Sequence, residues 1–157
     1  MNYWLAKTEP GTYSWDDLKN ETNKTTSWEG IRNYQIRNFI RDDIKNGDLV
    51  FIYHSVVNPM VIMGIAEVIR EAYPDHFAFD VSHKYYDQKS KLDNPTWLMF
   101  DIKAIQEFNP SVTLDELKNH PELNDMALLK KGNRLSIQKV SPDEWDFILK
   151  LTEVISL

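Results

Sequence analysis

The sequence predicts a single α+β domain over residues 1–157, built around a curved, mainly antiparallel sheet with flanking helices. Strand and helix patterns are interspersed without the regular βαβ spacing of a parallel sheet. The length suits one domain, and an apolar content of 42% is sufficient for one hydrophobic core. The chain has no internal repeat and no low-complexity segment, so repeat architectures are not expected.

The first half of the chain is predicted to contain two strands and two helices. Residues 3–7 alternate aromatic and aliphatic side chains and stop at a Pro-Gly turn, which predicts a strand. Ser14 is a suitable N-cap for a short helix with acidic residues in its first turn. Apolar residues recur at three- and four-residue spacing over 33–44, which predicts a helix with one buried stripe. Residues 49–54 are rich in aromatic and β-branched side chains and predict a buried strand.

Two long strands are predicted in the middle of the chain. Residues 60–72 read as a strand that is interrupted at Gly64, where glycine usually marks a bulge or a close backbone approach. Residues 96–108 form the second strand. The polar and aromatic stretch 73–95 contains two prolines and is predicted to be a loop, mobile unless bound, with at most one short strand.

The last part of the chain is predicted to contain two capped helices and a strand. Thr113 and Glu116 are spaced as a capping box, which predicts a short helix. Residues 135–140 are expected to form the closing strand. Ser141 followed by proline predicts the start of a final helix that ends near Leu151.

Charge and composition restrict the classes of function. Lys and Arg total 18 against 24 Asp and Glu, so a net charge of -6 argues against a surface that binds polyanions everywhere. Any nucleic-acid contact must therefore be local. The absence of cysteine excludes disulfides, thiolate zinc sites and thiol nucleophiles. The chain shows no basic leader and no apolar run of membrane-spanning length, so we expect a soluble, cytoplasmic protein with no membrane partner.

Catalytic and metal-binding motifs are not found. The sequence has no nucleophile elbow and no phosphate-binding glycine loop, and its four histidines are far apart along the chain. The adjacent acidic pairs point to different faces of their predicted helices, unlike a general acid with its base. We therefore expect no catalytic residues, no metal and no cofactor.

The most distinctive segment is residues 28–38, Trp-Glu-Gly-Ile-Arg-Asn-Tyr-Gln-Ile-Arg-Asn, in which aromatic rings, amides and arginines stand side by side. A nucleic-acid base needs a ring for stacking, an amide for its edge and a cation near its phosphate. The segment therefore predicts a base-binding site. On residue type alone, Trp28 is equally compatible with the core, and Asn33 with a helix cap.

Five motifs in order resemble the EVE domain family, within the PUA-like superfamily. The motifs are Tyr3-Trp4-Leu5-Ala6-Lys7-Thr8-Glu9-Pro10, residues 28–38, Gly47-Asp48-Leu49-Val50-Phe51-Ile52-Tyr53-His54-Ser55, Gly64-Ile65-Ala66-Glu67-Val68 with Arg70-Glu71-Ala72-Tyr73-Pro74-Asp75, and Asn133-Arg134-Leu135-Ser136-Ile137-Gln138. The resemblance covers nearly the whole chain. It implies a PUA-like pseudobarrel whose pocket accepts a flipped, often modified base, and a noncatalytic reader of modified DNA or RNA.

The resemblance also implies which residues form the site. Those of the base-binding pocket are Lys7, Thr8, Glu9, Trp28, Asn33, Tyr34, Tyr53, His54 and Ser55. The sequence itself indicates a local basic patch, because residues 129–136 carry three positive charges and no acid. The residues expected to hold phosphates are Arg37, Arg41, Lys130, Lys131 and Arg134, with additions from Lys84, Tyr85 and Tyr86 in the long loop. The remaining tryptophans, Trp4, Trp15, Trp97 and Trp145, are assigned to the core. Ile36 and the apolar stretch 56–60 depart from the family pattern and could alter which base fits.

Two other classes of function stay open. An enzyme acting on nucleotides or modified RNA would use Glu9 or His54 as a base in the same pocket. A protein-interaction module would instead present a broad exposed apolar patch.

Overall fold

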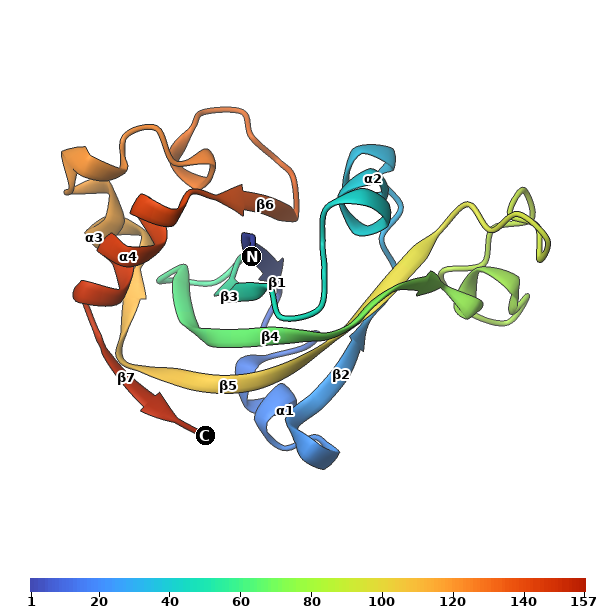
Figure 1. Ribbon diagram of the computed structural model, residues 1–157, viewed down its shortest axis with the longest axis horizontal. Coiled ribbons are helices and arrows are strands. Elements are labelled where there is room, and N and C mark those ends of the chain that lie inside the picture. Colours follow the sequence, from blue (N-terminus) through green and yellow to red (C-terminus); the bar gives the residue numbers. More distant parts are fainter.

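The computed structural model describes all residues, 1–157, and contains one seven-stranded mixed sheet (Figure 1). The strands lie in the order β2-β5-β4-β3-β1-β6, and β7 also pairs with β5. Chain order gives the elements β1 (Tyr3–Thr8), α1 (Trp15–Lys19), β2 (Thr25–Trp28), α2 (Tyr34–Asp42), β3 (Leu49–His54), β4 (Val61–Pro74), β5 (Leu98–Thr113), α3 (Leu114–Lys118), β6 (Ile137–Val140), α4 (Pro142–Lys150) and β7 (Glu153–Ser156). The α+β architecture predicted from the sequence is confirmed.

One parallel pair determines where the ends of three strands meet. β1 and β3 run parallel, whereas all other pairs are antiparallel. The two strands therefore end at the same edge of the sheet, where β6 begins. Backbone hydrogen bonds continue there, from Ser55 N to Thr8 O over 3.0 Å and from Lys7 N to Ser136 O over 2.8 Å. We call this edge the β1 terminus.

The core consists of two clusters, one on each face of β1 and β3. Alternate residues supply them: Trp4 and Ala6 belong to the first cluster and Leu5 to the second. Helix α2 covers the first cluster and α4 the second, on opposite sides of these strands in Figure 1. Trp4, Trp15, Trp97 and Trp145 are all buried, as the sequence predicted.

The helix starts follow the capping residues. Ser14 and Ser141 each form a complete capping box, with Asp17 and Glu144 respectively. Thr113 accepts a hydrogen bond from Glu116 N, 3.1 Å away, but the return bond that would complete a box is not formed. The predicted helices are thus confirmed. α1 and α3 are short, since each ends within about two turns of its cap residue.

The long strands differ in detail from the prediction. The register of β4 against β5 shifts next to Gly64, and a methyl group there would overlap both the Gln106 carbonyl and the Trp15 ring. Gly64 therefore marks a bulge and a close approach together. β5 continues to Thr113, five residues past the predicted end, because it pairs again with the start of β4. β2 and β7 were not predicted.

Residues 75–97 form a lobe that connects the end of β4 to the start of β5, at the right of Figure 1. The lobe contains a short 3-10 helix, His76–Phe79, and one isolated bridge between Lys91 and Asn94, rather than a strand. Other short 3-10 helices span Thr22–Lys24, Pro121–Leu123 and Ala127–Leu129. No helix has the length and apolar character needed to cross a bilayer.

Candidate nucleic-acid interface

A cavity of about 700 Å³ opens between the β1 terminus, β2 and the lobe. This volume lies within the range of ~300–1,000 Å³ that is usual for ligand sites. Side chains with hydroxyl, amine and carboxylate groups outnumber apolar ones in its lining. The lining residues are Lys7, Thr8, Glu9, Thr12, Tyr13, Thr26, Ser27, Trp28, Glu29, Gly30, Ile31, His83, Lys84, Tyr85 and Ser136.

Trp28 contributes an aromatic surface to this cavity. It ends β2 and pairs with Phe100 of β5, so its indole packs partly against the first core cluster. The side chain is half-buried rather than sealed in the interior, and its remaining surface lines the cavity. β2 forms from the polar sequence Thr-Thr-Ser-Trp because its backbone extends the edge of β5. Trp28 therefore serves both the core and the cavity.

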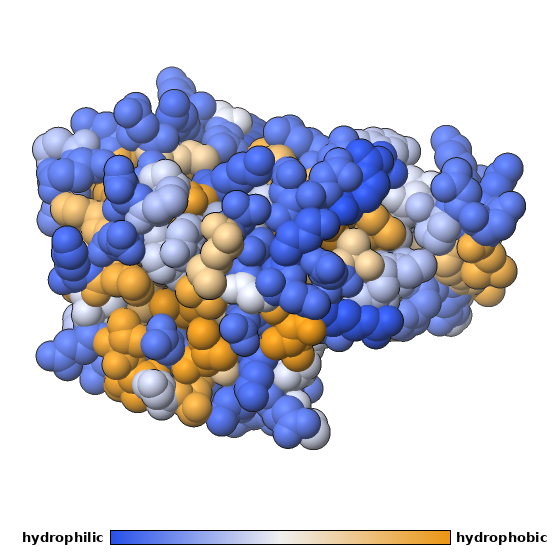
Figure 2. All heavy atoms as spheres, viewed as in Figure 1, coloured by the Kyte–Doolittle hydropathy of each residue, from blue (hydrophilic) through white to orange (hydrophobic).

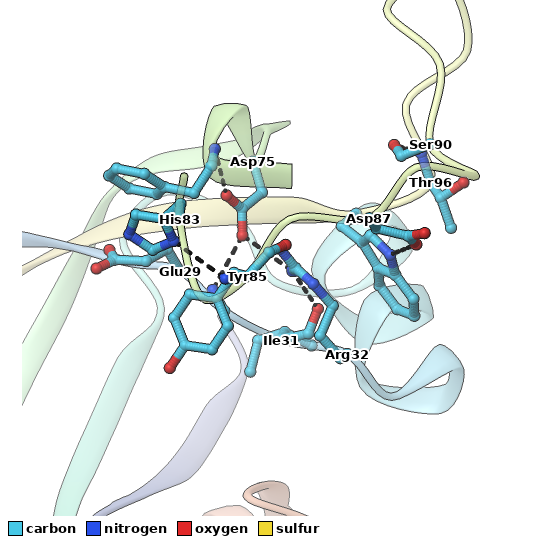
Figure 3. A network of polar contacts seen from close by, with 12 residues as sticks. Glu29, Ile31, Arg32, Asp75, His83, Tyr85, Asp87, Ser90 and Thr96 are labelled. Carbon is cyan, nitrogen blue, oxygen red and sulfur yellow. Dashed lines mark hydrogen bonds and ion pairs between the residues drawn. The ribbon is translucent and has the colours of Figure 1, made fainter. Parts of the chain in front are cut away.

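A buried carboxylate joins the lobe to the segment that follows Trp28 (Figure 3). Asp75 is completely buried and accepts hydrogen bonds from Gly30 N at 2.9 Å and Phe77 N at 3.0 Å. Its Oδ2 also lies 3.1 Å from Arg32 Nη1. Arg32 Nη2 in turn donates to the Tyr85 carbonyl over 2.6 Å. One acidic side chain thus fixes both walls of the cavity relative to each other.

Tyr85 lies directly on the backbone of Gly30. Gly30 has a φ of +81°, and a methyl group at this position would overlap the Tyr85 ring. Glycine is required here both by the left-handed backbone and by the ring. The Arg32 guanidinium lies 5.3 Å from the centre of the same ring, and the Tyr85 amide donates to His83 Nδ1 over 3.1 Å. These contacts hold a second aromatic ring at the cavity.

The cavity carries a partly buried amine without an acidic partner. Burial lowers the pKa of Lys7 from its ordinary 10.5, and the ion pairs of the structure involve other basic residues. Burial also raises the pKa of Tyr13 to about 12, so its hydroxyl stays protonated and donates to Glu21. Since burial disfavours the charged amine, an anionic or oxygen-bearing ligand would stabilise it.

Four residues of the predicted base pocket come together in this cavity, and five lie outside its lining. Lys7, Thr8, Glu9 and Trp28 line it; Asn33, Tyr34, Tyr53, His54 and Ser55 do not. The side chain of Asn33 caps α2 by accepting from Ile36 N at 3.0 Å. Tyr34 is 62% exposed and packs on Trp97, on the outer side of α2.

The end of β3 faces the protein interior rather than the cavity. Tyr53 is buried in the second core cluster. His54 is 8% exposed, and its Nε2 accepts from Trp15 N at 3.0 Å, while burial lowers its pKa. Its Nε2 lone pair is therefore occupied by a structural hydrogen bond. Ser55 contributes its amide to Thr8, as described above.

The predicted phosphate ligands fall into two groups. Arg37 donates to the Thr96 carbonyl at 3.0 Å, and Arg41 pairs with Asp42 at 2.8 Å, so both have partners within the protein. Lys130, Lys131 and Arg134 are exposed and lie in the loop that leads to Ser136 at the cavity. No group of three or more His, Cys, Asp or Glu residues is arranged to hold a metal ion.

The wall formed by the lobe is not predicted from the sequence. The sequence predicts for Tyr85 only a supporting contact with the backbone of the nucleic acid, and no role for His83. The signals available were Asp75 at the end of the Arg-Glu-Ala-Tyr-Pro-Asp motif and Gly30 after Trp28. Neither reveals its partner without the fold.

Comparison with known proteins identifies the family. The EVE domain model matches residues 2–151. The chain belongs to the EVE domain family. Thymocyte nuclear protein 1 of Gallus gallus is 39% identical over 96% of this chain and 69% of its own length. That of Homo sapiens is 38% identical over 97% of this chain and 74% of its own length.

Solved EVE-like structures share the whole fold. A Pseudomonas putida protein has a TM-score of 0.88 at 39% identity, covering 95% of this chain and 98% of its own. Human THYN1 in complex with DNA containing 5-methylcytosine has a TM-score of 0.89 at 38% identity, covering 96% of this chain and 97% of its own. These similarities confirm the PUA-like fold expected for this EVE domain.

Proposed function

We propose that this EVE domain is a noncatalytic module that binds DNA carrying a modified base and holds that base, flipped out of the stack, in the cavity beside Trp28. The observation that supports this most strongly is the half-buried indole of Trp28 on a polar cavity of about 700 Å³. A base stacked on an aromatic ring is stabilised by ~1–3 kcal/mol. The related human protein in complex with 5-methylcytosine-containing DNA supports DNA as the partner.

The remaining lining suits the edge of a heterocycle. Hydroxyl groups of Thr26, Ser27 and Ser136 can donate to or accept from a base, and Lys7 can donate to a carbonyl or phosphate oxygen. Glu29 accepts from Ser27 Oγ over 2.6 Å, which orients that hydroxyl. The site offers aromatic surface for stacking and several groups for hydrogen bonding, which suits recognition of a base.

Lys130, Lys131 and Arg134 are proposed to contact the phosphates on either side of the bound base. They are exposed and precede Ser136 of the cavity. Each neutralised phosphate should contribute about 0.9 to the salt dependence of binding to duplex DNA, or about 0.7 for a single strand. Removing one of these cations should reduce that slope without changing the preference for a modified base.

Fluorescence anisotropy with labelled oligonucleotides tests the proposal. Duplex DNA, single-stranded DNA and RNA are compared with and without 5-methylcytosine, using wild type, Trp28→Phe and Trp28→Ala. We expect Trp28→Phe to keep most of the affinity and Trp28→Ala to bind about 5- to 150-fold more weakly, which corresponds to the stacking energy. Equal affinity of all three proteins for every oligonucleotide would reject the site.

A further inference from the structure

The turn between β3 and β4 presents an apolar surface of unusual composition. Val56, Val57 and Met60 are 76%, 40% and 36% exposed, and Pro59 lies between them. Residues 55–60 include no charged side chain. Turns are usually built from Gly, Pro, Asn, Asp and Ser, and Ser55, Asn58 and Pro59 are of this kind, whereas Val56, Val57 and Met60 are not. These side chains therefore need an explanation other than turn formation.

Val56 is also held in an unfavourable backbone conformation. Its φ is +54°, in the left-handed region that is an outlier for a β-branched residue. Its side chain points largely into solvent, so packing offers little compensation. Asn or Gly would adopt this conformation more easily. An apolar, strained and exposed residue is costly for folding, which is typical of a residue retained for contact with a partner.

The turn lies at the same edge of the sheet as the cavity. Ser55, immediately before Val56, is bonded to Thr8 of the cavity lining over 3.0 Å. On the other side of β1, Lys7 is bonded to Ser136, next to the basic loop that contains Arg134. The apolar turn, the cavity and the basic loop therefore follow one another around the β1 terminus.

We propose that the Val56–Met60 turn is a wedge that enters the base stack of duplex DNA while the extruded base occupies the cavity. This inference rests on the proposed function and adds the element that fills the gap left by the base. Apolar side chains inserted at a base step are a general means of stabilising an unstacked duplex. The uncharged turn brings no carboxylate toward the phosphates, although the protein as a whole carries a net charge of -6.

A second copy of the chain fits this surface less well. A stable protein interface buries at least about 1,000 Å² in total, far more than three partly exposed side chains can supply. A single base step needs only two or three such side chains. The base stack is therefore the occupant that matches the size of the turn.

The test compares duplex and single-stranded DNA. A triple variant, Val56→Asn, Val57→Asn and Met60→Gln, removes the apolar surface, while Val154→Asn with Ile155→Asn is the matched control. Those control residues are 38% and 41% exposed on β7. β7 runs along the lower left of Figure 1, and Figure 2 shows an apolar region on that side of the same view. Anisotropy gives the affinity for duplex and single strand, each with 5-methylcytosine. A 2-aminopurine next to the modified base reports unstacking by its fluorescence.

Selective weakening of duplex binding would support the wedge. We expect the triple variant to bind the duplex about tenfold more weakly, or about 1.4 kcal/mol, and to lose most of the 2-aminopurine signal at saturation. Its affinity for the single strand and the behaviour of the β7 control should match wild type.

Four outcomes would overturn the wedge. Unchanged duplex affinity and signal would reject it while leaving the proposed function intact. Equal weakening on duplex and single strand would assign the turn to a general contact, and loss of self-association in sedimentation without an effect on DNA would assign it to a second copy. Absence of binding by wild type to any oligonucleotide would reject the wedge and the proposed function together.

Discussion

Replacing Gly30 by alanine tests the contact that places Tyr85 at the cavity. Gly30 has a φ of +81°, and a left-handed alanine costs roughly 1–2 kcal/mol. The added methyl group would also overlap the Tyr85 ring, and overpacking of this kind costs about 1–3 kcal/mol. We therefore expect Gly30→Ala to lower the free energy of unfolding by about 2–5 kcal/mol, measured by urea denaturation.

Gly132 provides a matched control for the backbone contribution. Its φ is +83°, but nothing lies within 4 Å of an added methyl group. Gly132→Ala should therefore show only the backbone cost of about 1–2 kcal/mol. In a Tyr85→Ala background, Gly30→Ala should fall to the same value, which gives a coupling energy of about 1–3 kcal/mol.

The binding assay should follow the same pattern. Displacing the ring by Gly30→Ala should weaken binding of the modified duplex about as much as removing it by Tyr85→Ala. Stability effects of Gly30→Ala and Tyr85→Ala that add within about 0.5 kcal/mol would refute the placement of the ring on Gly30.

Three further substitutions test other parts of the site. Asp75→Ala leaves Arg32 and two amides without their acceptor, so we expect the free energy of unfolding, measured by urea denaturation, to fall by about 3–5 kcal/mol. As a control, Asp42→Ala at the exposed Arg41 pair should change it little. Burial lowers the pKa of Lys7 below 10.5, so the free protein loses this charge at lower pH than the complex does. DNA affinity measured by anisotropy should therefore fall as the pH rises from neutral toward 10.5, and the affinity of Lys7→Met should be weaker and vary less with pH. Identical pH profiles of the two proteins would contradict the assignment. Val56→Asn relieves the backbone strain of the left-handed conformation and should raise the free energy of unfolding by up to about 1 kcal/mol. A decrease would show that the valine side chain makes stabilising contacts.

The sequence predicted the elements whose patterns are local. Capping residues located α1, α3 and α4, and periodicity located α2, because these signals act within a few residues. β2 and β7 were missed because their sequences, Thr-Thr-Ser-Trp and Glu-Val-Ile-Ser, are short and mostly exposed or half-buried. Both are strands because β5 offers them a free edge, which only the assembled sheet reveals.

The lining of the cavity follows local sequence only in part. Lys7, Thr8, Glu9 and Trp28 lie close to turns in the motifs that carry the family resemblance, and they line the cavity. The family resemblance predicts that the residues at the end of β3 face a ligand. Here α1 covers that end, so His54 bonds to Trp15, and its neighbour Tyr53 enters the second core cluster.

The lobe wall could not be predicted from local pattern. Tyr85 is held at the cavity by contacts between the lobe and the segment after Trp28, in which Arg32 lies 43 residues from Asp75 and 53 residues from Tyr85 along the chain. A polar segment with two prolines resembles an ordinary loop until these contacts form. The family resemblance predicts a pocket beside Trp28, and only the fold reveals that Tyr85 lines the same cavity.

A crystal structure of the protein with a duplex containing 5-methylcytosine would show whether the modified base occupies the cavity. We expect electron density for an extruded base that is stacked on the Trp28 indole, with Tyr85 beside the base and the edge of the base facing Ser27 or Lys7. DNA bound on another face, with every base still stacked in the duplex, would contradict this expectation.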